Sequence, residues 1–244
     1  MQNRGVVYTA WGKCIEEAER SASTAKKFGL KTCLVSNHYA GSAFDHFIRT
    51  DASLTHHTEK IHAWGLSPFK TTLYLDTDTQ IVGDPAYGFE MAERYGMAIA
   101  IAPACHLKLH WGYHIDQYWK TPIPDDLVEY NTGVLFHSAA HPVFGDVLKK
   151  TALLIQQSFE KTHEEFVRCP LNDQSGLTVY LWERGLNPSV LSQNWNFRPG
   201  IYQEKKVSVP GGFGPIKIWH SRMPIPEGFD VNQKGFWDLP TLRA

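Results

Sequence analysis

Cysteine is scarce in this sequence, and the few cysteines lie far apart. Only four occur in 244 residues, at Cys14, Cys33, Cys105 and Cys169, and no two form a Cys-x-x-Cys pair. A chain of this length can bury a substantial core without disulfide bonds, so a disulfide framework is not expected. The pattern favours reduced thiols in a cytoplasmic protein.

Long apolar runs and an excess of one charge are missing as well. The longest apolar stretch, residues 97–105, is far shorter than the roughly 20 residues that a membrane-spanning helix needs. Residues 5–10 already have the character of a strand, so we expect no signal peptide. The net charge of −1 argues against a nucleic-acid partner, because nucleic-acid binders usually carry a basic excess.

No internal repeat or low-complexity linker divides the chain, so we predict a single domain over residues 1–244. The first half alternates strand and helix patterns. Strands are predicted at 6–9, 32–35, 72–75 and 97–102, and helices at 15–28, 58–64 and 85–95. This order predicts an α/β fold with a mostly parallel, Rossmann-like sheet and helices on both faces. In such sheets, ligands bind at the carboxyl ends of the strands.

The second half, from residue 106 onward, is more irregular. A strand is predicted at 133–137, helices at 142–159 and 172–184, and short strands at 190–191 and 216–219. Loops rich in proline and glycine connect the later elements. Long loops beside a sheet commonly carry a binding site or a lid.

The most informative segment is LYLDTDT at residues 73–79. An apolar run ends in two aspartates, which indicates a buried strand whose tip carries Asp76 and Asp78. Alternate residues of a strand point the same way, so both carboxylates can face one point, where they repel each other unless a cation lies between them. Mg²⁺ and Mn²⁺ take oxygen ligands and bridge phosphate oxygens. The motif therefore predicts a metal that holds a diphosphate; a solvated Asp-x-Asp turn is the alternative.

Several segments together resemble family 8 glycosyltransferases, the glycogenin-like family. KIHAWGL at 60–66, followed by LYLDTDT, resembles that family's Lys-apolar-x-x-Trp-x-Leu helix and its strand ending in Asp-x-Asp-Thr. Further pieces in the family's order are YTA at 8–10, NTGVLF at 131–136, NDQ at 172–174 and IKIWH at 216–220. The resemblance spans about residues 5 to 222 and implies a divergent member with the GT-A fold.

The resemblance implies a metal-dependent, retaining transfer of a sugar from a nucleotide-diphosphate sugar, with UDP as the expected nucleotide. The acceptor would be a carbohydrate or another hydroxyl compound. Residues 1–105 would form the nucleotide-sugar half, and residues 106–244 the acceptor half. Asp76, Asp78 and His220 would ligate the metal, and two carboxylates with one imidazole suit Mn²⁺ somewhat better than Mg²⁺.

The resemblance also assigns residues to the donor and to the chemistry. The expected nucleotide-sugar contacts are Tyr8, Thr9, Ala10, Lys60, Asp76, Thr77, Asp78, Asn131 and Arg222. The expected catalytic residues are Lys60, with its ammonium near the phosphates or the sugar, and Asp173 and Gln174, which would hold sugar hydroxyls. From the residues alone, ordinary explanations stay open: a solvated helix lysine at Lys60, helix capping by Asp173 and Gln174, a strand-entry turn at Asn131 and a surface histidine at His220.

One end of the motif set departs from the family. The family continues with His-x-x-Gly-x-x-Lys-Pro-Trp, whereas here His220 is followed by SRMP at 221–224. The lysine expected over the β-phosphate is therefore missing. Arg222 is a candidate replacement, although an arginine fork and a lysine point charge are not equivalent.

The stretch 106–119 allows two further interpretations. His106, His110 and His114 are four residues apart and would share a helix face as a second metal site, but Gly112 weakens a helix there. The nearby aromatic residues fit either a stacking wall for an acceptor sugar or plain packing; they are Trp111, Tyr113, Tyr118 and Trp119.

No carboxylate clearly fills the role of an acceptor-side base, which an inverting transferase needs. Asp125, Asp126 and Glu129 fit an ordinary loop and helix start. This absence, together with the family resemblance, favours retention of configuration.

Three other functions compete with sugar transfer. A haloacid-dehalogenase-type phosphatase also has a strand ending in Asp-x-Asp, but Gln80 stands where that class has Thr or Val, and a whole βαβ unit precedes the motif. A nucleotidyltransferase would need a glycine-rich, arginine-containing loop, which residues 8–13 do not provide. A non-catalytic homologue that only binds nucleotide sugars is the third, because the motif around His220 is altered.

Overall fold

The computed structural model describes residues 2–50, 57–106, 109–110, 113–114, 122–141, 173–199 and 215–232. Its elements in chain order are β1 (Gln2–Thr9), α1 (Cys14–Lys26), β2 (Lys31–Ser36), β3 (His46–Arg49), α2 (His57–Gly65), β4 (Phe69–Leu75), β5 (Thr79–Ile81), α3 (Ala86–Tyr95), β6 (Met97–His106), β7 (Leu109–His110), β8 (Tyr113–His114), β9 (Val128–Ser138), α5 (Asp173–Glu183), β10 (Ser189–Leu191), the 3₁₀ helix η2 (Gln193–Asn196) and β11 (Ile218–His220).

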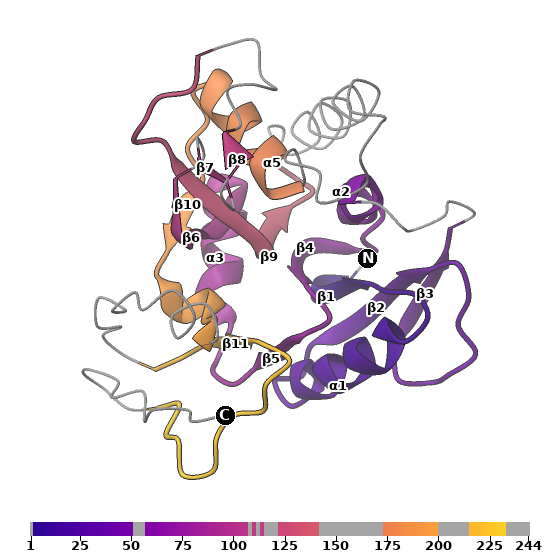
Figure 1. Cartoon of the computed structure of the whole chain (residues 1–244). Coiled ribbons are helices and arrows are strands. Elements are labelled where there is room, and N and C mark those ends of the chain that lie inside the picture. The colour runs from indigo at the N-terminus through magenta and orange to yellow at the C-terminus, as the bar shows by residue number, and fades with distance from the viewer. Residues whose placement is uncertain are drawn as a thin grey trace.

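Seven strands form the central sheet, in the order β10-β6-β9-β4-β1-β2-β3 (Figure 1). Strand β9 runs antiparallel to both of its neighbours, β4 and β6, whereas the other four pairings are parallel. The prediction of an α/β fold with a mostly parallel sheet is therefore confirmed.

Helices cover both faces of this sheet, as predicted. Neighbouring strand residues point to opposite faces, so Val6 and Tyr8 of β1 pack in the cluster that contains Ala18 and Ala22 of α1, together with residues of α3. Val7, between them, packs in the opposite cluster with residues of α2 and α5. The alanines of α1 are spaced to lie on one helix face, and their small side chains allow that helix to approach the sheet closely.

The structure differs from the prediction at several elements. Strands β3 and β5 were not predicted; β3 alternates half-buried and exposed residues at the sheet edge, so its apolar signal is weak. Strand β9 starts at Val128 rather than at residue 133. The helix predicted at 142–159 lies outside the described residues.

The helical interpretation of the histidine-rich stretch is wrong. His106 ends β6, and the next described residues form a short hairpin in which β7 pairs antiparallel with β8. Backbone pairing between these strands replaces the helix that would have placed the histidines on one face. The side chains of residues 106–119, including the proposed aromatic wall, lie outside the described part of the chain.

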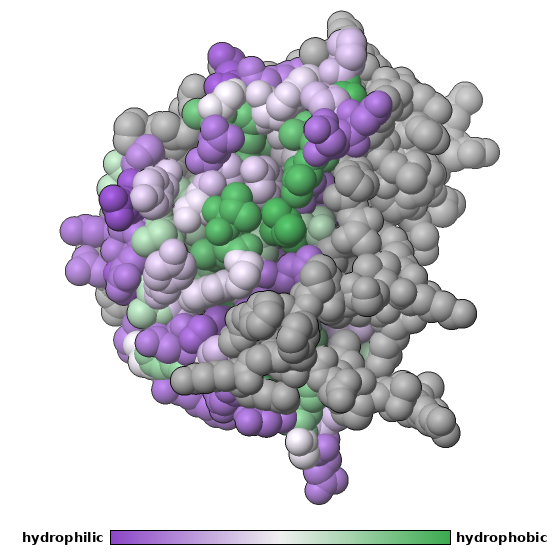
Figure 2. Space-filling model, turned by 90° about the vertical axis from the view of Figure 1, so that its left-hand side faces the viewer, coloured by the Kyte–Doolittle hydropathy of each residue, from purple (hydrophilic) through white to green (hydrophobic). Residues whose placement is uncertain are grey.

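Strand β10 forms the edge of the sheet opposite β3, and its Val190 is exposed. Figure 2 views the molecule from the side that carries β10 and shows apolar side chains gathered in the middle of that face.

Within the described residues, no helix combines the length and the apolar composition needed to cross a membrane. Cys14 and Cys33 are free thiols.

A small second sheet brings the C-terminal part of the chain to the tip of β4. Strand β11 pairs antiparallel with β5, so that His220 lies opposite Thr79, three residues beyond Asp76. Trp219 is fully buried and packs against Phe197 and Phe229, which anchors β11 from the other side. The pairing places residues about 140 positions apart in the sequence beside one another.

Candidate metal and donor-binding site

A cavity of about 490 Å³ opens at the carboxyl ends of β1 and β4. Its described lining residues come from seven segments of the chain. They are Thr9, Trp11, Cys14, Lys60, Tyr74, Asp76, Thr77, Asp78, Asn131, Thr132, Gly133, Asp173, Gln174, Arg198, His220 and Arg222. Ten of the twelve site residues predicted from the sequence lie in this set, since only Tyr8 and Ala10 are absent from it.

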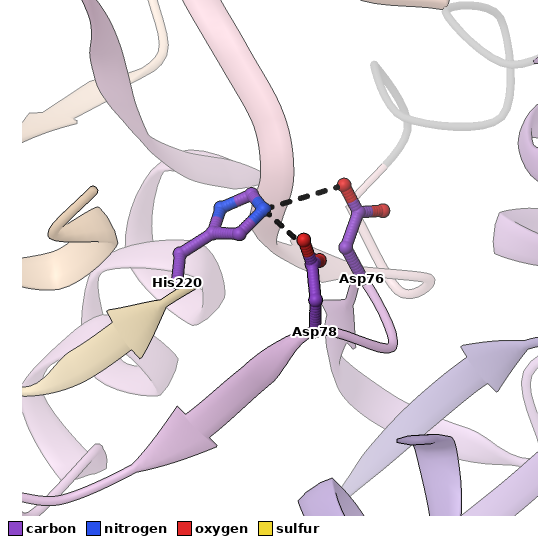
Figure 3. Close-up of side chains that lie close together, drawn as sticks. All are labelled: Asp76, Asp78 and His220. Carbon is purple, nitrogen blue, oxygen red and sulfur yellow. Dashed lines mark ion pairs between the residues drawn. The ribbon is translucent and has the colours of Figure 1, made fainter. Parts of the chain in front are cut away.

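Asp76, Asp78 and His220 form a compact cluster, with one ligand atom of each lying within 4.8 Å of the others. Figure 3 shows the imidazole of His220 pointing from β11 toward the two carboxylates, which flank the turn between β4 and β5. Its Nε2 lies 3.2 Å from Oδ1 of Asp78 and 3.8 Å from Oδ2 of Asp76. The sequence prediction that these three residues meet is therefore confirmed as a candidate metal site.

Backbone hydrogen bonds hold the two aspartates in place. The N–H of Asp76 donates to the carbonyl of Gly133 on β9, at 2.9 Å. The carbonyl of Asp78 accepts from the N–H of Ser221, at 2.8 Å. The hydroxyl of Thr79 donates to the carbonyl of Asp76 and closes the turn. Both carboxylates are thus presented by a turn that is tied to β9 and to the segment after β11.

The charges of the cluster are unequal. Burial alone would raise the pKa of Asp78, but the hydrogen bond from His220 and the charge that this imidazole carries when protonated, with a smaller effect from Arg198, lower it to about 2. Asp78 therefore stays ionised, and it lies beside a second carboxylate. Two carboxylates and an imidazole nitrogen are a donor set that fits a divalent cation such as Mn²⁺ or Mg²⁺.

His220 is oriented by two asparagines. Its Nδ1 lies 2.6 Å from Oδ1 of Asn196, whose Nδ2 donates to Oδ1 of Asn131 at 2.7 Å. That same oxygen of Asn131 accepts from the backbone N–H of Gly133 at 3.0 Å. All of these side chains are buried. Asn131 was predicted to touch the donor, and its side chain here reaches the metal site through Asn196, a residue that the sequence did not reveal.

Because Gly133 has no side chain, the ring of His220 can lie directly against its backbone. A Cβ at this position would overlap the Cε1 of His220 and lie 2.8 Å from Oδ2 of Asp76. Any other residue would therefore push against two of the three candidate ligands. The glycine of the Asn-Thr-Gly segment is required by this close approach.

A second charged cluster lies on the other side of Asp76. The ammonium of Lys60 is 2.7 Å from Oδ1 of Asp76 and 2.9 Å from Oδ2 of Asp173. The hydroxyl of Thr132 makes a short hydrogen bond to the same oxygen of Asp173, and Lys60 also lies over the ring of Tyr74. Burial would lower the pKa of Lys60, but the two carboxylates raise it, so the lysine stays charged. Lys60 is thus a largely enclosed ion-pair partner, with a side chain 14% exposed, and not a solvated helix lysine.

Asp173 and Gln174 begin α5 and are both buried at the cavity. An acidic residue in the first turn interacts favourably with the helix dipole, as the capping alternative supposed. The Asp173 carboxylate also pairs with Lys60, so capping does not account for it fully.

Tyr8 and Ala10 do not line the cavity. Both are fully buried in the core beside α1, and the hydroxyl of Tyr8 accepts a hydrogen bond from Ser21 at 3.1 Å. Thr9, between them, points to the opposite face and does line the cavity, because strand residues alternate. The predicted contact of Tyr8 and Ala10 with a nucleotide stays a prediction.

The turn residue Thr77 and the candidate lysine replacement Arg222 share one partner, Glu17 of α1. The hydroxyl of Thr77 donates to Glu17 at 3.1 Å, and Nε of Arg222 lies 3.1 Å from its other oxygen. The side chain of Arg222 is 72% exposed. A second cation, Arg198, lines the cavity from the segment after η2 and was not predicted, because no motif marks it.

The carboxylates considered as acceptor-side bases lie elsewhere. Asp125 and Asp126 are exposed, Glu129 is fully buried, and none of the three lines the cavity.

Comparisons with known proteins rest on structure alone, because no protein-family model and no curated protein matches the sequence. The structure of mouse xyloside xylosyltransferase 1 in its apo form matches 92% of this chain and 99% of its own, with a TM-score of 0.57 and 18% identity. The glycosyltransferase GlyE of Streptococcus pneumoniae TIGR4 matches 96% of this chain, with a TM-score of 0.58 and 18% identity, and the match covers 58% of GlyE. The chain therefore has the fold of GT-A glycosyltransferases, in a sequence that has diverged widely from both structures.

Proposed function

We propose that the protein is a metal-dependent glycosyltransferase that moves a sugar from a UDP-sugar to a hydroxyl acceptor with retention of configuration. One observation carries the proposal: Asp76, Asp78 and His220 converge at the mouth of a cavity in a GT-A fold. Both solved structures named above are glycosyltransferases by their titles.

The cluster would hold Mn²⁺ or Mg²⁺ through Asp76, Asp78 and His220, and the cation would stabilise the negative charge that builds on the departing diphosphate. Arg198 and Arg222 line the same cavity and supply positive charge from the chain itself. Arg198 lies close enough to lower the pKa of Asp78, whereas Arg222 is held by Glu17 at the rim. We assign the stronger diphosphate contact to Arg198.

Lys60, Asp173 and Gln174 would orient the sugar. The ammonium of Lys60 fixes the Asp173 carboxylate at one position in the cavity wall, so its second oxygen can accept a hydrogen bond from a sugar hydroxyl. The amide of Gln174 can both donate and accept at the neighbouring position.

The carboxylates that line this cavity support the proposal of retention. Among its described lining residues, Asp76 and Asp78 belong to the metal cluster, and Asp173 is engaged by Lys60 and Thr132. None is left to act as a dedicated base, so the departing phosphate oxygen would take the acceptor proton on the face where the new bond forms. Proton NMR of the product's anomeric centre tests this, since a β-linked product from an α-linked donor would contradict it.

UDP binding with and without metal tests the proposal directly. We expect UDP to raise the melting temperature in Mn²⁺ or Mg²⁺ and not in excess chelator, because a ligand that binds the native state stabilises it by mass action. Equal UDP affinity in chelator, measured by calorimetry, would contradict the metal-diphosphate site.

A screen of UDP-sugars for turnover separates the alternatives. Sugar loss from the donor supports a transferase, whereas metal-dependent UDP binding without turnover would indicate the non-catalytic homologue. Hydrolysis of a simple phosphate ester, with Asp76 as the nucleophile, would indicate the phosphatase. The ion pair between Asp76 and Lys60 and the GT-A fold give that alternative no support.

A further inference from the structure

A continuous chain of hydrogen bonds joins the backbone of β9 to His220. The N–H of Gly133 and the NH₂ group of Asn196 both donate to Oδ1 of Asn131, and Oδ1 of Asn196 faces Nδ1 of His220. Its three side chains are 2–4% exposed. Water therefore competes little for these contacts, and each polar atom depends on its protein partner.

The direction of the chain follows from its first donor. A backbone N–H can only donate, so the atom of Asn131 that faces Gly133 is its oxygen. That oxygen also faces Asn196, so Asn196 must present its NH₂ group to it. The oxygen of Asn196 is then turned to His220, and an amide oxygen can only accept.

The proton of neutral His220 is therefore placed on Nδ1. With the proton on Nε2 instead, the lone pair of Nδ1 would face the amide oxygen of Asn196 at 2.6 Å, which is repulsive. A flip of the Asn196 amide would relieve that contact but would turn its oxygen toward the oxygen of Asn131. The bond from Gly133 blocks the compensating flip of Asn131.

We propose that Asn131 and Asn196 are positioning residues that select the Nδ1–H tautomer of His220 and so aim the lone pair of Nε2 at a metal between Asp76 and Asp78. Metal-ligating histidines are oriented and made more basic by the partner of their other nitrogen. The ligand role of Nε2 rests on the proposed function, whereas the tautomer does not. The backbone N–H of Gly133, which every residue except proline would also provide, fixes the orientation of both asparagine amides.

The tautomer can be read without any metal. The protein is labelled with ¹⁵N-histidine, and long-range proton–nitrogen spectra are recorded in excess chelator at alkaline pH, with His220 assigned as the signal that His220→Asn lacks. We expect the Nδ1–H tautomer in the wild type and the Nε2–H tautomer in Asn196→Leu, because the carboxylates of Asp76 and Asp78 remain near Nε2 as acceptors for the ring proton. An Nε2–H tautomer in the wild type would overturn the proposal.

Mn²⁺ titration, followed by the electron paramagnetic resonance of the free ion, tests the consequence for the metal. Asn196→Leu should weaken Mn²⁺ binding by about 10–100-fold, the usual loss when a partner of a metal-bound histidine is removed. Asn194→Leu is the matched control: Asn194 is a buried residue of the same turn, and its side chain donates to the carbonyl of Pro215 instead of to the chain of asparagines.

The outcomes are distinguishable. Unchanged Mn²⁺ affinity in Asn196→Leu would overturn the positioning role. If the wild type itself bound no Mn²⁺, the proposed function would fail, and the spectra in chelator would still decide whether the asparagines select the tautomer. Melting temperatures of all variants in chelator show whether a substitution has unfolded the protein.

Discussion

Two charged clusters meet at Asp76, and the negative charge of the carboxylates is balanced differently in each. One oxygen of Asp76 faces Lys60 and the other faces His220. In the first cluster, Lys60 and Asp173 have side chains only 14% and 5% exposed, and the cation is part of the chain. In the second, Asp76 and Asp78 are 29% and 25% exposed, and the chain supplies an imidazole in place of a permanent cation.

The difference indicates which cluster is structural and which takes a ligand. A buried carboxylate needs a partner, because an unpaired charge in the interior is costly. Asp173 has that partner built in, so its side of the site can form before anything binds. The pair of Asp76 and Asp78 is more open, and under the proposed function a cation from solution would complete its charge balance.

The largest effect on stability should come from removing the built-in cation. Lys60→Met removes the cation that pairs with the buried carboxylate of Asp173, which should lower the free energy of unfolding by about 3–5 kcal/mol. Urea unfolding in chelator measures this loss. Lys60→Met/Asp173→Asn removes both charges and should recover most of it; a double variant no more stable than the single one would show that the pair is not the source.

Breaking the open cluster should instead cost activity. Asp78→Asn removes a charged oxygen from the metal site and should lower the transfer rate by about 10²-fold or more. Thermal unfolding in chelator should change little, because the side chain is partly exposed. Asp84→Asn is the matched control, since Asp84 is exposed and only caps the N–H of Ala86. Near-normal turnover in Asp78→Asn would mean that the motif is structural.

His220 ends β11 and Arg222 follows it, and substitutions of the two residues should differ in effect. His220→Ala removes a buried candidate ligand. Loss of the hydrogen-bond partner of a metal-bound histidine weakens metal binding by roughly 10–100-fold, and we expect loss of the histidine itself to weaken Mn²⁺ binding at least as much. Arg222→Ala removes a side chain that is largely exposed and should cost less. Calorimetric titration with Mn²⁺ and UDP compares them, with Arg198→Ala as a third variant. If Arg222→Ala were the most damaging, the diphosphate contact assigned to Arg198 would belong to Arg222.

The smallest effect is expected from a single methyl group. Gly133→Ala places a Cβ against the ring of His220 and should destabilise the metal-free protein. In the His220→Ala background the ring is gone, so the same substitution should cost less. A double-mutant cycle in urea should give a coupling energy of about 0.5–3 kcal/mol, typical of residues in contact. Additive costs would contradict the close approach.

Local patterns predicted the first half of the molecule well. The strands and helices from β1 to β6 were expected near their observed positions, except for β3 and β5, because their apolar periodicity and glycine or proline boundaries are short-range signals. The sheet's mixed character also agrees with the expected mostly parallel arrangement. Strand β5 has only three residues and exists because β11 pairs with it, so its own sequence carries little signal.

The candidate site was predicted where a motif marks it. Asp76 and Asp78 follow a buried strand, as predicted, but the turn after β4 and not strand alternation brings their carboxylates together. The resemblance marked the segment at 8–10 as a nucleotide contact, and alternation along β1 places Tyr8 in the core and Thr9 at the cavity. The resemblance indicated the segment, and it could not separate the two faces of the strand.

The sequence by itself determined the elements, the paired carboxylates and the order in which the site segments occur, because each of these depends on residues close together in the chain. Only the tertiary structure decided that β11 brings His220 to Asp78, that Lys60 joins Asp76 to Asp173, and that Asn196 orients the imidazole. Three of those contacts join residues far apart in the chain: Asp78 with His220, Lys60 with Asp173, and Asn131 with Asn196, which are 65 positions apart. They arise because strand pairing and core packing bring distant segments together at the carboxyl ends of the central strands. Closing the long loops between these segments costs chain entropy, and no local sequence pattern shows which loops close.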